Sequence, residues 1–232
     1  MNMSITVLGT DYEGLVISVG LAAMGHKVTA INTDTNRVRR LQRGTGFTED
    51  AELSHTMKLV LREGLLKFSS EPESCLAEAD AVIISGMTGS DSESLTERTA
   101  ILRIAECLSG AIASFSTVLV TAGVPTGSCR ILQDWLNDAI HTGAAHVVTY
   151  PVFFSKPDGL HQFLNPERIV LGYENEHSRR TVDEIFANIL MNDPPVCHVT
   201  WESAEMMRAE FGVIAASVPA EEKVYGHFSR VS

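Results

Sequence analysis

Cysteine pairs, basic charge and long apolar runs are all scarce in this 232-residue sequence. The four cysteines are widely spaced and form no C-x-x-C pair, so they indicate neither a zinc site nor a disulfide framework. We therefore expect free thiols and a cytoplasmic location. Met1 is not followed by the basic, apolar and small-residue succession of a signal peptide. No apolar segment reaches the ~18–20 residues of a membrane span, so we expect none.

Basic residues are outnumbered: 18 Lys and Arg against 29 Asp and Glu give a net charge of −11 at pH 7. Binding to nucleic acid or to an anionic membrane needs basic surface, so both partners are disfavoured. The 44% of hydrophobic residues is typical of a globular protein. A chain of this length buries enough surface to fold without disulfides or structural metals.

Short β-branched runs alternate with longer helical segments, which predicts a doubly wound α/β (Rossmann-like) fold with a mostly parallel sheet and a C-terminal helix. The predicted strands are residues 4–8, 27–31, 66–69, 81–85, 117–121, 146–150, 169–172 and 196–200. The predicted helices are residues 14–24, 36–42, 50–63, 71–79, 97–108, 125–140, 178–190 and 202–216. We expect at least six strands in the sheet with residues 4–8 in its interior, an irregular loop over 152–162, and a helix end at Pro219.

The first predicted strand runs into Gly9, Thr10, Asp11, Tyr12, Glu13 and Gly14, where a helix begins. This strand–turn–helix setting is that of the dinucleotide fingerprint G-x-G-x-x-G. Gly9 and Gly14 fit its first and third glycines, but Asp11 stands at the second, where the pyrophosphate approaches the backbone. Both glycines are also explained by the turn and by close packing alone.

A carboxylate about 4 Å from one phosphate charge costs about 4 kcal/mol at an effective dielectric constant of 20. Asp11 therefore turns away, or a cation bridges it to the phosphate, or dinucleotide binding is weakened. The acidic residue that receives the adenosine ribose at the end of the second strand is also missing, because Asn32 stands there. Asp34 is best explained as the cap of the following helix.

Several stretches, in order, resemble the UDP-glucose/GDP-mannose dehydrogenase family. They are residues 5–15, 20–22 and 25–29 around the first turn, 40–44, the V-P-T-G-S run from Val124, the F-L-N-P-E-R-I-V-L-G run from Phe163, and 203–206. The resemblance implies an NAD-binding domain over residues 1–200 and a remnant of the family's central, dimer-forming helix over 201–232. It implies cofactor contacts from Gly9, Thr10, Asp11, Tyr12, Gly14, Asn32, Thr88 and Pro125, with binding weakened or lost.

The same resemblance implies that the family reaction, two NAD-dependent oxidations of a sugar alcohol, is lost. Ala122 and Gly123 stand for the family's serine and threonine, Val152 for its glutamate, Arg208 for its lysine and Gly212 for its asparagine. The family's second domain carries its catalytic cysteine, and we expect none of the four cysteines to replace it. We name no catalytic residue.

Other candidates are weak. Cys129, His161, Asp91 and Glu93 lack a partner in the sequence, and the histidine pairs 141/146 and 177/198 lack a third metal ligand, so we predict no metal site. The helix over 202–216 carries Met206, Met207, Phe211, Val213 and Ile214, whose apolar surface we expect a homodimer to cover. The alternative is that residues 219–232 fold back over it.

Two functions remain open. One is a degenerate nucleotide-sugar dehydrogenase-like domain, a pseudoenzyme that binds a nucleotide, a nucleotide sugar or a partner protein. The other is an NAD-dependent oxidoreductase acting on a nucleotide sugar or another alcohol, completed by a second chain. NAD titration followed by a turnover assay distinguishes them.

Overall fold

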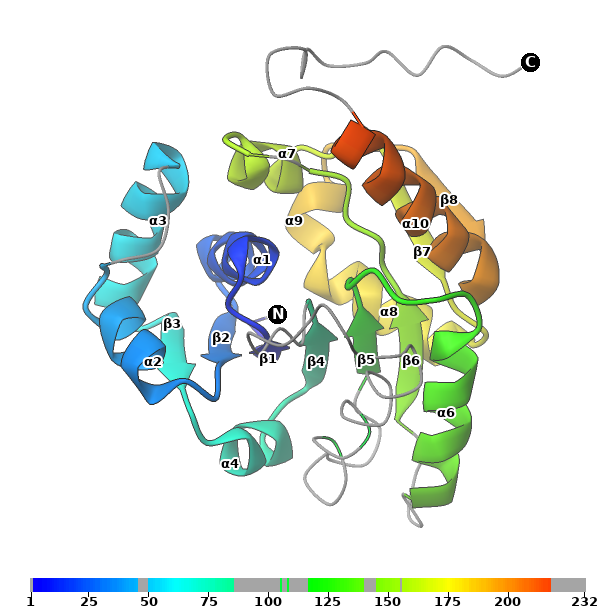
Figure 1. Cartoon of the computed structure of the whole chain (residues 1–232), viewed down its shortest axis with the longest axis horizontal. Helices are drawn as coiled ribbons and strands as arrows, with labels where there is room; N and C mark the ends of the chain where they lie inside the picture. The colour runs from blue at the N-terminus through cyan, green and yellow to red at the C-terminus, as the bar shows by residue number, and fades with distance from the viewer. Residues whose placement is uncertain are drawn as a thin grey trace.

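A computed structural model of the chain describes residues 2–45, 50–85, 105, 108, 117–139, 145–154 and 156–217 (Figure 1). In these residues eight strands form a single sheet, in the order β3-β2-β1-β4-β5-β6-β7-β8. The strands are β1 (Ser4–Leu8), β2 (Lys27–Ile31), β3 (Leu66–Ser69), β4 (Ala81–Ile84), β5 (Thr117–Val120), β6 (His146–Thr149), β7 (Ile169–Gly172) and β8 (Val196–Val199).

Strands β3 to β6 in this order are all parallel, whereas β7 runs antiparallel to β6 through the single pair Thr149–Gly172. Strand β8 is parallel to β7. β1 lies between β2 and β4, so the predicted interior position of the first strand is confirmed. The chain reverses its direction of strand addition between β1 and β4, and the crevice at such a switch point is where open α/β sheets bind ligands.

Helices cover both faces of the sheet (Figure 1). They are α1 (Tyr12–Ala23), α2 (Thr35–Gln42), α3 (Ala51–Arg62), α4 (Pro72–Ala77), α6 (Ser128–Ala139), α7 (Gly159–Leu164), α8 (Glu176–Ile185), α9 (Ala187–Leu190) and α10 (Trp201–Ser217). One apolar cluster joins the sheet to α1, α3, α7 and α8, and a second joins it to α4, α6 and the start of α10. None of the helices in the described ranges has the length and hydropathy required to cross a bilayer.

The central strands β4 and β5 and the helix α1 carry no polar face, because they are covered on all sides by the rest of the fold. All four residues of β4 and of β5 are buried, as expected for central strands covered on both sides. Every residue of α1 from 14 to 22 is buried as well. This helix is sandwiched between the sheet and its neighbours α3 and α7, so it does not need the polar stripe of a surface helix.

The expected irregular loop over 152–162 is partly wrong, because α7 begins inside it. Leu160 and Phe163 are buried, and the Phe163 ring lies so close to Gly20 of α1 that a Cβ at Gly20 would clash with it. A six-residue helix held by this tertiary contact carries too short an apolar pattern to be found from sequence.

Two helix boundaries also differ. The helix expected over 178–190 is two helices, α8 and α9, which meet at Phe186. The helix expected to open at Pro125 begins at Ser128, after a turn in which the Ser128 amide donates to the Pro125 carbonyl. Of the predicted helix over 97–108 only Ala105 and Leu108 are described, both helical and buried. Pro219 lies outside the described residues.

Candidate functional site

The candidate site is the turn between β1 and α1, at the switch point of the sheet. Gly9 has a φ of 118°, a backbone conformation that favours glycine. A Cβ at Gly14 would lie 2.6 Å from Ser85 Oγ and would also clash with the Gly9 carbonyl. Both glycines are therefore required by the turn and by close helix–strand packing, as the sequence predicted.

Asp11 is the N-cap of α1, with its Oδ1 accepting a hydrogen bond from the Gly14 amide at 2.8 Å. Capping of this kind satisfies one of the amides that a helix otherwise leaves free at its N-terminus. Those amides are what a Rossmann domain offers to a pyrophosphate. The Asp11 carboxylate therefore takes up one of these amides.

A second carboxylate lies in the same helical turn. Glu13 Oε2 accepts from Arg208 Nη2 of α10 at 2.6 Å, and only 18% of each side chain is exposed. Glu13 Oε1 and Arg208 Nε are buried, and neither has a hydrogen-bond partner among the residues that the structure describes. The pair joins the first turn of α1 to α10 across 195 positions of sequence.

Burial raises the pKa of Glu13 to about 7, even though the positive charge of Arg208 lowers it. The nearby charge of Asp11 raises the pKa further. The desolvation penalty on a buried carboxylate thus exceeds what one arginine returns. Glu13 was not among the predicted site residues; its partner could not be read from local sequence.

Thr10 is buried and is held by two side chains from the far side of the turn. Asn32 Nδ2 donates to Thr10 Oγ1 at 2.8 Å, and Arg37 Nε donates to the same oxygen at 2.9 Å. Arg37 Nη2 also donates to the Thr10 carbonyl. Asn32, at the end of β2, and Thr10, both named as cofactor contacts, thus lie together, and Arg37 of α2 joins them although the sequence analysis did not name it.

The Tyr12 side chain forms tertiary contacts with two other segments of the chain. Its hydroxyl donates to Asp50 Oδ2 at 2.9 Å and accepts from the Gly159 amide at 3.1 Å. Burial has the largest effect on the pKa of Tyr12 and raises it, and the hydrogen bond to Asp50 raises it further. The Lys156 ammonium lies 5.0 Å from the ring centroid, a cation–π distance. Tyr12 therefore ties the turn to the starts of α3 and α7.

Pro125 lies in the turn after β5, next to the start of α6. The buried carboxylate of Glu205, from α10, accepts from the Gly127 amide at 2.5 Å and the Cys129 amide at 2.8 Å. The N-terminus of α6 is thus capped by a side chain 76 positions away. Thr88, Asp91 and Glu93 lie outside the described residues.

The other candidates show no reactive arrangement. Cys129 is buried in α6, accepts from Thr149 Oγ1 at 3.1 Å, and burial raises its pKa. Val152 is buried in the apolar core. His161 is exposed on α7 rather than in a loop.

The ring centroids of His146 and His177 lie 5.4 Å apart, and His141 lies outside the described residues. Burial lowers the pKa of His146, and His177 lowers it further. Across the described ranges no three His, Cys, Asp or Glu side chains converge as metal ligands.

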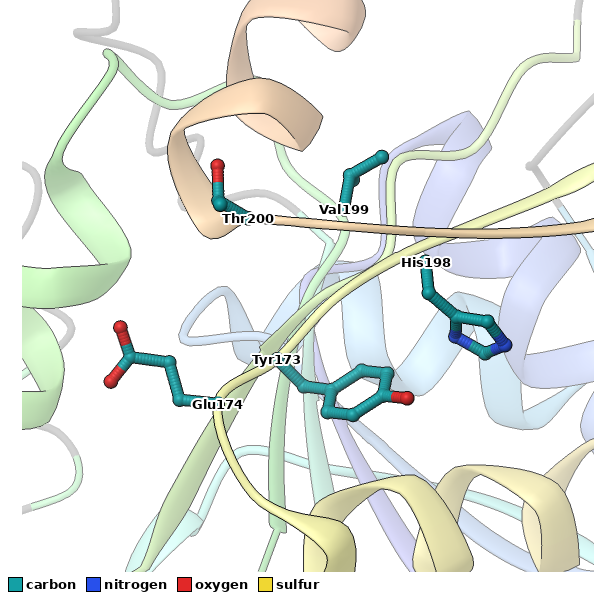
Figure 2. Close-up of a pocket in the computed structure, with 5 residues that line it drawn as sticks. All are labelled: Tyr173, Glu174, His198, Val199 and Thr200. Carbon is teal, nitrogen blue, oxygen red and sulfur yellow. The ribbon is translucent and has the colours of Figure 1, made fainter.

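An open depression of about 370 Å³ lies elsewhere, at the β7–β8 edge (Figure 2). It is lined by Tyr173, Glu174, His198, Val199 and Thr200. The Tyr173 and His198 rings meet edge-on at 5.5 Å, and Glu174 is paired with Arg130 at 3.0 Å. None of these residues belongs to the β1–α1 turn, so this depression is not the dinucleotide site.

The sheet order, the glycine turn and the helix that follows define a Rossmann-type dinucleotide-binding domain. Residues 3–190 match the family described as the UDP-glucose/GDP-mannose dehydrogenase family, NAD binding domain. The chain belongs to this family, and the matching domain is the one with which these dehydrogenases bind NAD.

Its relatives are longer proteins. The UDP-glucose 6-dehydrogenase YwqF of Bacillus subtilis is 26% identical over 207 residues, which are 89% of this chain and 46% of YwqF. The putative UDP-glucose 6-dehydrogenase YtcA of the same organism is 28% identical over 89% of this chain and 47% of its own. This chain therefore spans about half the length of the curated relatives it matches.

Known structures show the same fold. GDP-mannose dehydrogenase from Pseudomonas aeruginosa superposes with a TM-score of 0.82 at 21% identity, over 93% of this chain and 50% of that one. UDP-glucose dehydrogenase from Pyrobaculum islandicum gives 0.81 at 24% identity over the same shares.

Proposed function

We propose that this domain keeps the scaffold of a nucleotide-sugar dehydrogenase but binds NAD weakly, and acts by binding a nucleotide, a nucleotide sugar or a partner rather than by catalysing the family reaction alone. The observation that carries the proposal is the Asp11 cap. A pyrophosphate entering the turn meets a carboxylate already bonded to the Gly14 amide.

The energetic argument is electrostatic. To bind in the usual place, the pyrophosphate must displace the Asp11 carboxylate or approach it, at about 4 kcal/mol for charges 4 Å apart at a dielectric constant of 20. Arg208, the basic residue of α10, is already paired with Glu13 and cannot bridge Asp11 to a phosphate without breaking that pair. The residues at the pyrophosphate half of the site do not fit NAD well.

The substituted positions support the same proposal. Arg208, which stands where the resemblance places a lysine, is held by Glu13. Val152, which stands where it places a glutamate, packs in the apolar core. An arginine held in an ion pair and a buried valine are both unsuited by their chemistry to take a proton from a substrate.

The alternative is an NAD-dependent oxidoreductase completed by another chain. The intact geometry of Gly9 and Gly14 favours it, since the turn itself can still accept a nucleotide. A cytoplasmic location and a homodimer through α10 also stay predictions.

Calorimetric titration of NAD tests the proposal. We expect weak or undetectable binding to the natural sequence, and binding at least about a hundredfold tighter in Asp11→Gly and Asp11→Asn. Asparagine keeps an oxygen that can cap the helix but carries no charge, so Asp11→Asn measures the effect of the negative charge on NAD binding while the cap is retained. Sub-micromolar NAD affinity in the natural sequence contradicts the proposal, and turnover of UDP-glucose or GDP-mannose supports the alternative.

A further inference from the structure

The segment that follows β2 and forms α2, residues 34–43, is positively charged although the whole chain is acidic. Arg37, Arg39, Arg40 and Arg43 fall within seven positions, and residues 34–43 carry a net charge of +3 in a chain of −11. Concentrated positive charge of this kind attracts anions, and arginine is well suited to phosphate because its planar fork donates two parallel hydrogen bonds.

These arginines have no acidic partner among the described residues, where the ion pairs are those of Arg130, Arg179 and Arg208. The one carboxylate in the segment, Asp34, is used as the N-cap of α2. Its Oδ1 accepts from the amides of Asn36 at 2.8 Å and Arg37 at 3.2 Å. The charge of the arginines is therefore not neutralised by ion pairing within the segment.

Arg37 is also fixed in place. Its bonds to Thr10 hold the guanidinium against the β1–α1 turn, next to Asn32 at the end of β2. Arg40 follows one turn later on the same side of α2, by its i, i+3 spacing. Both lie beside the point where a Rossmann domain receives the adenosine ribose.

At that point an acidic residue binds the ribose 2′-hydroxyl and repels a 2′-phosphate, whereas a nearby arginine accommodates the phosphate. Here the residue is the neutral Asn32, and the arginine is present. Asn32 directs its amide to Thr10 and its Oδ1 to the Asp34 amide at 2.8 Å, so it places no charge on the site.

We propose that Asn32 and the arginines of α2 form a phosphate site that selects nucleotides carrying a phosphate on the adenosine ribose, so that NADP binds in preference to NAD. The inference rests on the proposed function in one respect, that the β1–α1 turn takes a nucleotide. It concerns the adenosine half of the site, which is separate from the Asp11 cap.

Two pairs of probes test it: NADP against NAD, and 2′-AMP against 5′-AMP, titrated by calorimetry into the natural chain and into Asp11→Asn. We expect NADP to bind at least about tenfold tighter than NAD, and 2′-AMP tighter than 5′-AMP, in both proteins. In Asn32→Asp the preference should be lost or reversed. Arg37→Ala should weaken NADP by a larger factor than NAD, and Arg39→Ala, on the opposite side of α2, should change neither.

The outcomes separate the two proposals. NADP no tighter than NAD in Asp11→Asn, or 2′-AMP no tighter than 5′-AMP, overturns the phosphate site whatever Asp11 does. If Asp11→Asn binds neither dinucleotide more tightly than the natural chain does, the proposed role of Asp11 is wrong. The phosphate site is still supported in that case if 2′-AMP binds more tightly than 5′-AMP and Asn32→Asp abolishes this difference. Because Arg37→Ala also removes bonds to Thr10, Asn32→Asp is the decisive variant if the alanine variant does not fold.

Discussion

At the residue scale, the candidate site is shaped by two carboxylates in the first turn of α1, one of which caps the helix while the other pairs with α10. Asp11 is partly exposed and bonded to the Gly14 amide. Glu13 is largely buried and bonded to Arg208. An anion entering the turn meets both, so the helix N-terminus no longer presents the purely positive end that favours phosphate.

The raised pKa of Glu13 predicts a stability that depends on pH. The native pKa of about 7 lies above the ordinary value of 4.5, so between those values the native state binds more protons than the unfolded state. The free energy of unfolding should therefore fall as pH rises from about 4.5 to about 7, by no more than about 3 kcal/mol. In Glu13→Gln this loss should be absent.

Urea denaturation at several pH values between 4.5 and 8 measures the effect. Glu210→Gln, at an exposed position on the helix that carries Arg208, is the matched control and should keep the pH dependence of the natural sequence. Parallel stability curves for the natural chain and Glu13→Gln would contradict the assignment.

Residue roles could be predicted only where the backbone alone demands them. Gly9 and Gly14 were found because a positive φ and a close approach to Ser85 require glycine. Glu13 and Arg37 were not, since their partners are set by the tertiary fold. The effect of Asp11 could be framed as three alternatives, and the structure adds that its carboxylate caps α1 through the Gly14 amide.

At the element scale, long-range capping joins helices that the sequence treats as separate. Glu205 of α10 caps α6 through the amides of Gly127 and Cys129. Its side chain is buried, so its removal leaves one buried and one part-buried donor without that partner. We expect Glu205→Ala to lower the free energy of unfolding by roughly 2–4 kcal/mol.

Glu202→Ala is the control, one turn earlier on the same helix. Glu202 pairs with the exposed Arg130 at 2.8 Å, and a surface pair of this kind contributes at most about 1 kcal/mol. Chemical denaturation of the two variants compares the buried cap with the surface pair. Equal losses in both would show that Glu205 does not hold α6 to α10.

Element boundaries follow the same division. Strands and long helices were predicted within a few residues because their apolar patterns are continuous, as in the fully buried β4 and β5. The short α7 depends on Phe163 packing against Gly20, and the break between α8 and α9 falls within one periodic segment. Neither the short helix α7 nor the break between α8 and α9 is marked by a pattern in the neighbouring sequence, so neither could be predicted from it.

At the scale of the whole molecule, the strand order follows from the alternation of strands and helices together with the right-handed crossovers of parallel sheets. That alternation is continuous up to β6, and the predicted interior position of β1 is confirmed there. The antiparallel β7 had no counterpart in the prediction, because the direction of a strand after an irregular connection is set by packing.

The surface of α10 carries the last prediction, a homodimer. Met206 is 50% exposed, and Met207 and Phe211 are half-buried, with the Phe211 ring resting edge-on against Phe153 at 5.2 Å. Phe211 is thus partly covered within the chain, which leaves Met206 as the better position to test. A two-fold axis along α10 would let this apolar surface cover its own copy.

Sedimentation velocity at micromolar concentration tests the homodimer. We expect a dimer for the natural chain and a monomer for Met206→Glu, because a buried, unpaired carboxylate at each copy of the interface opposes association. Met191→Glu is the matched control, since Met191 is 84% exposed and follows α9 rather than lying on α10. It should remain dimeric. If the natural chain sediments as a monomer across the concentration range, there is no homodimer. If Met206→Glu still dimerises, the dimer interface does not include this part of α10.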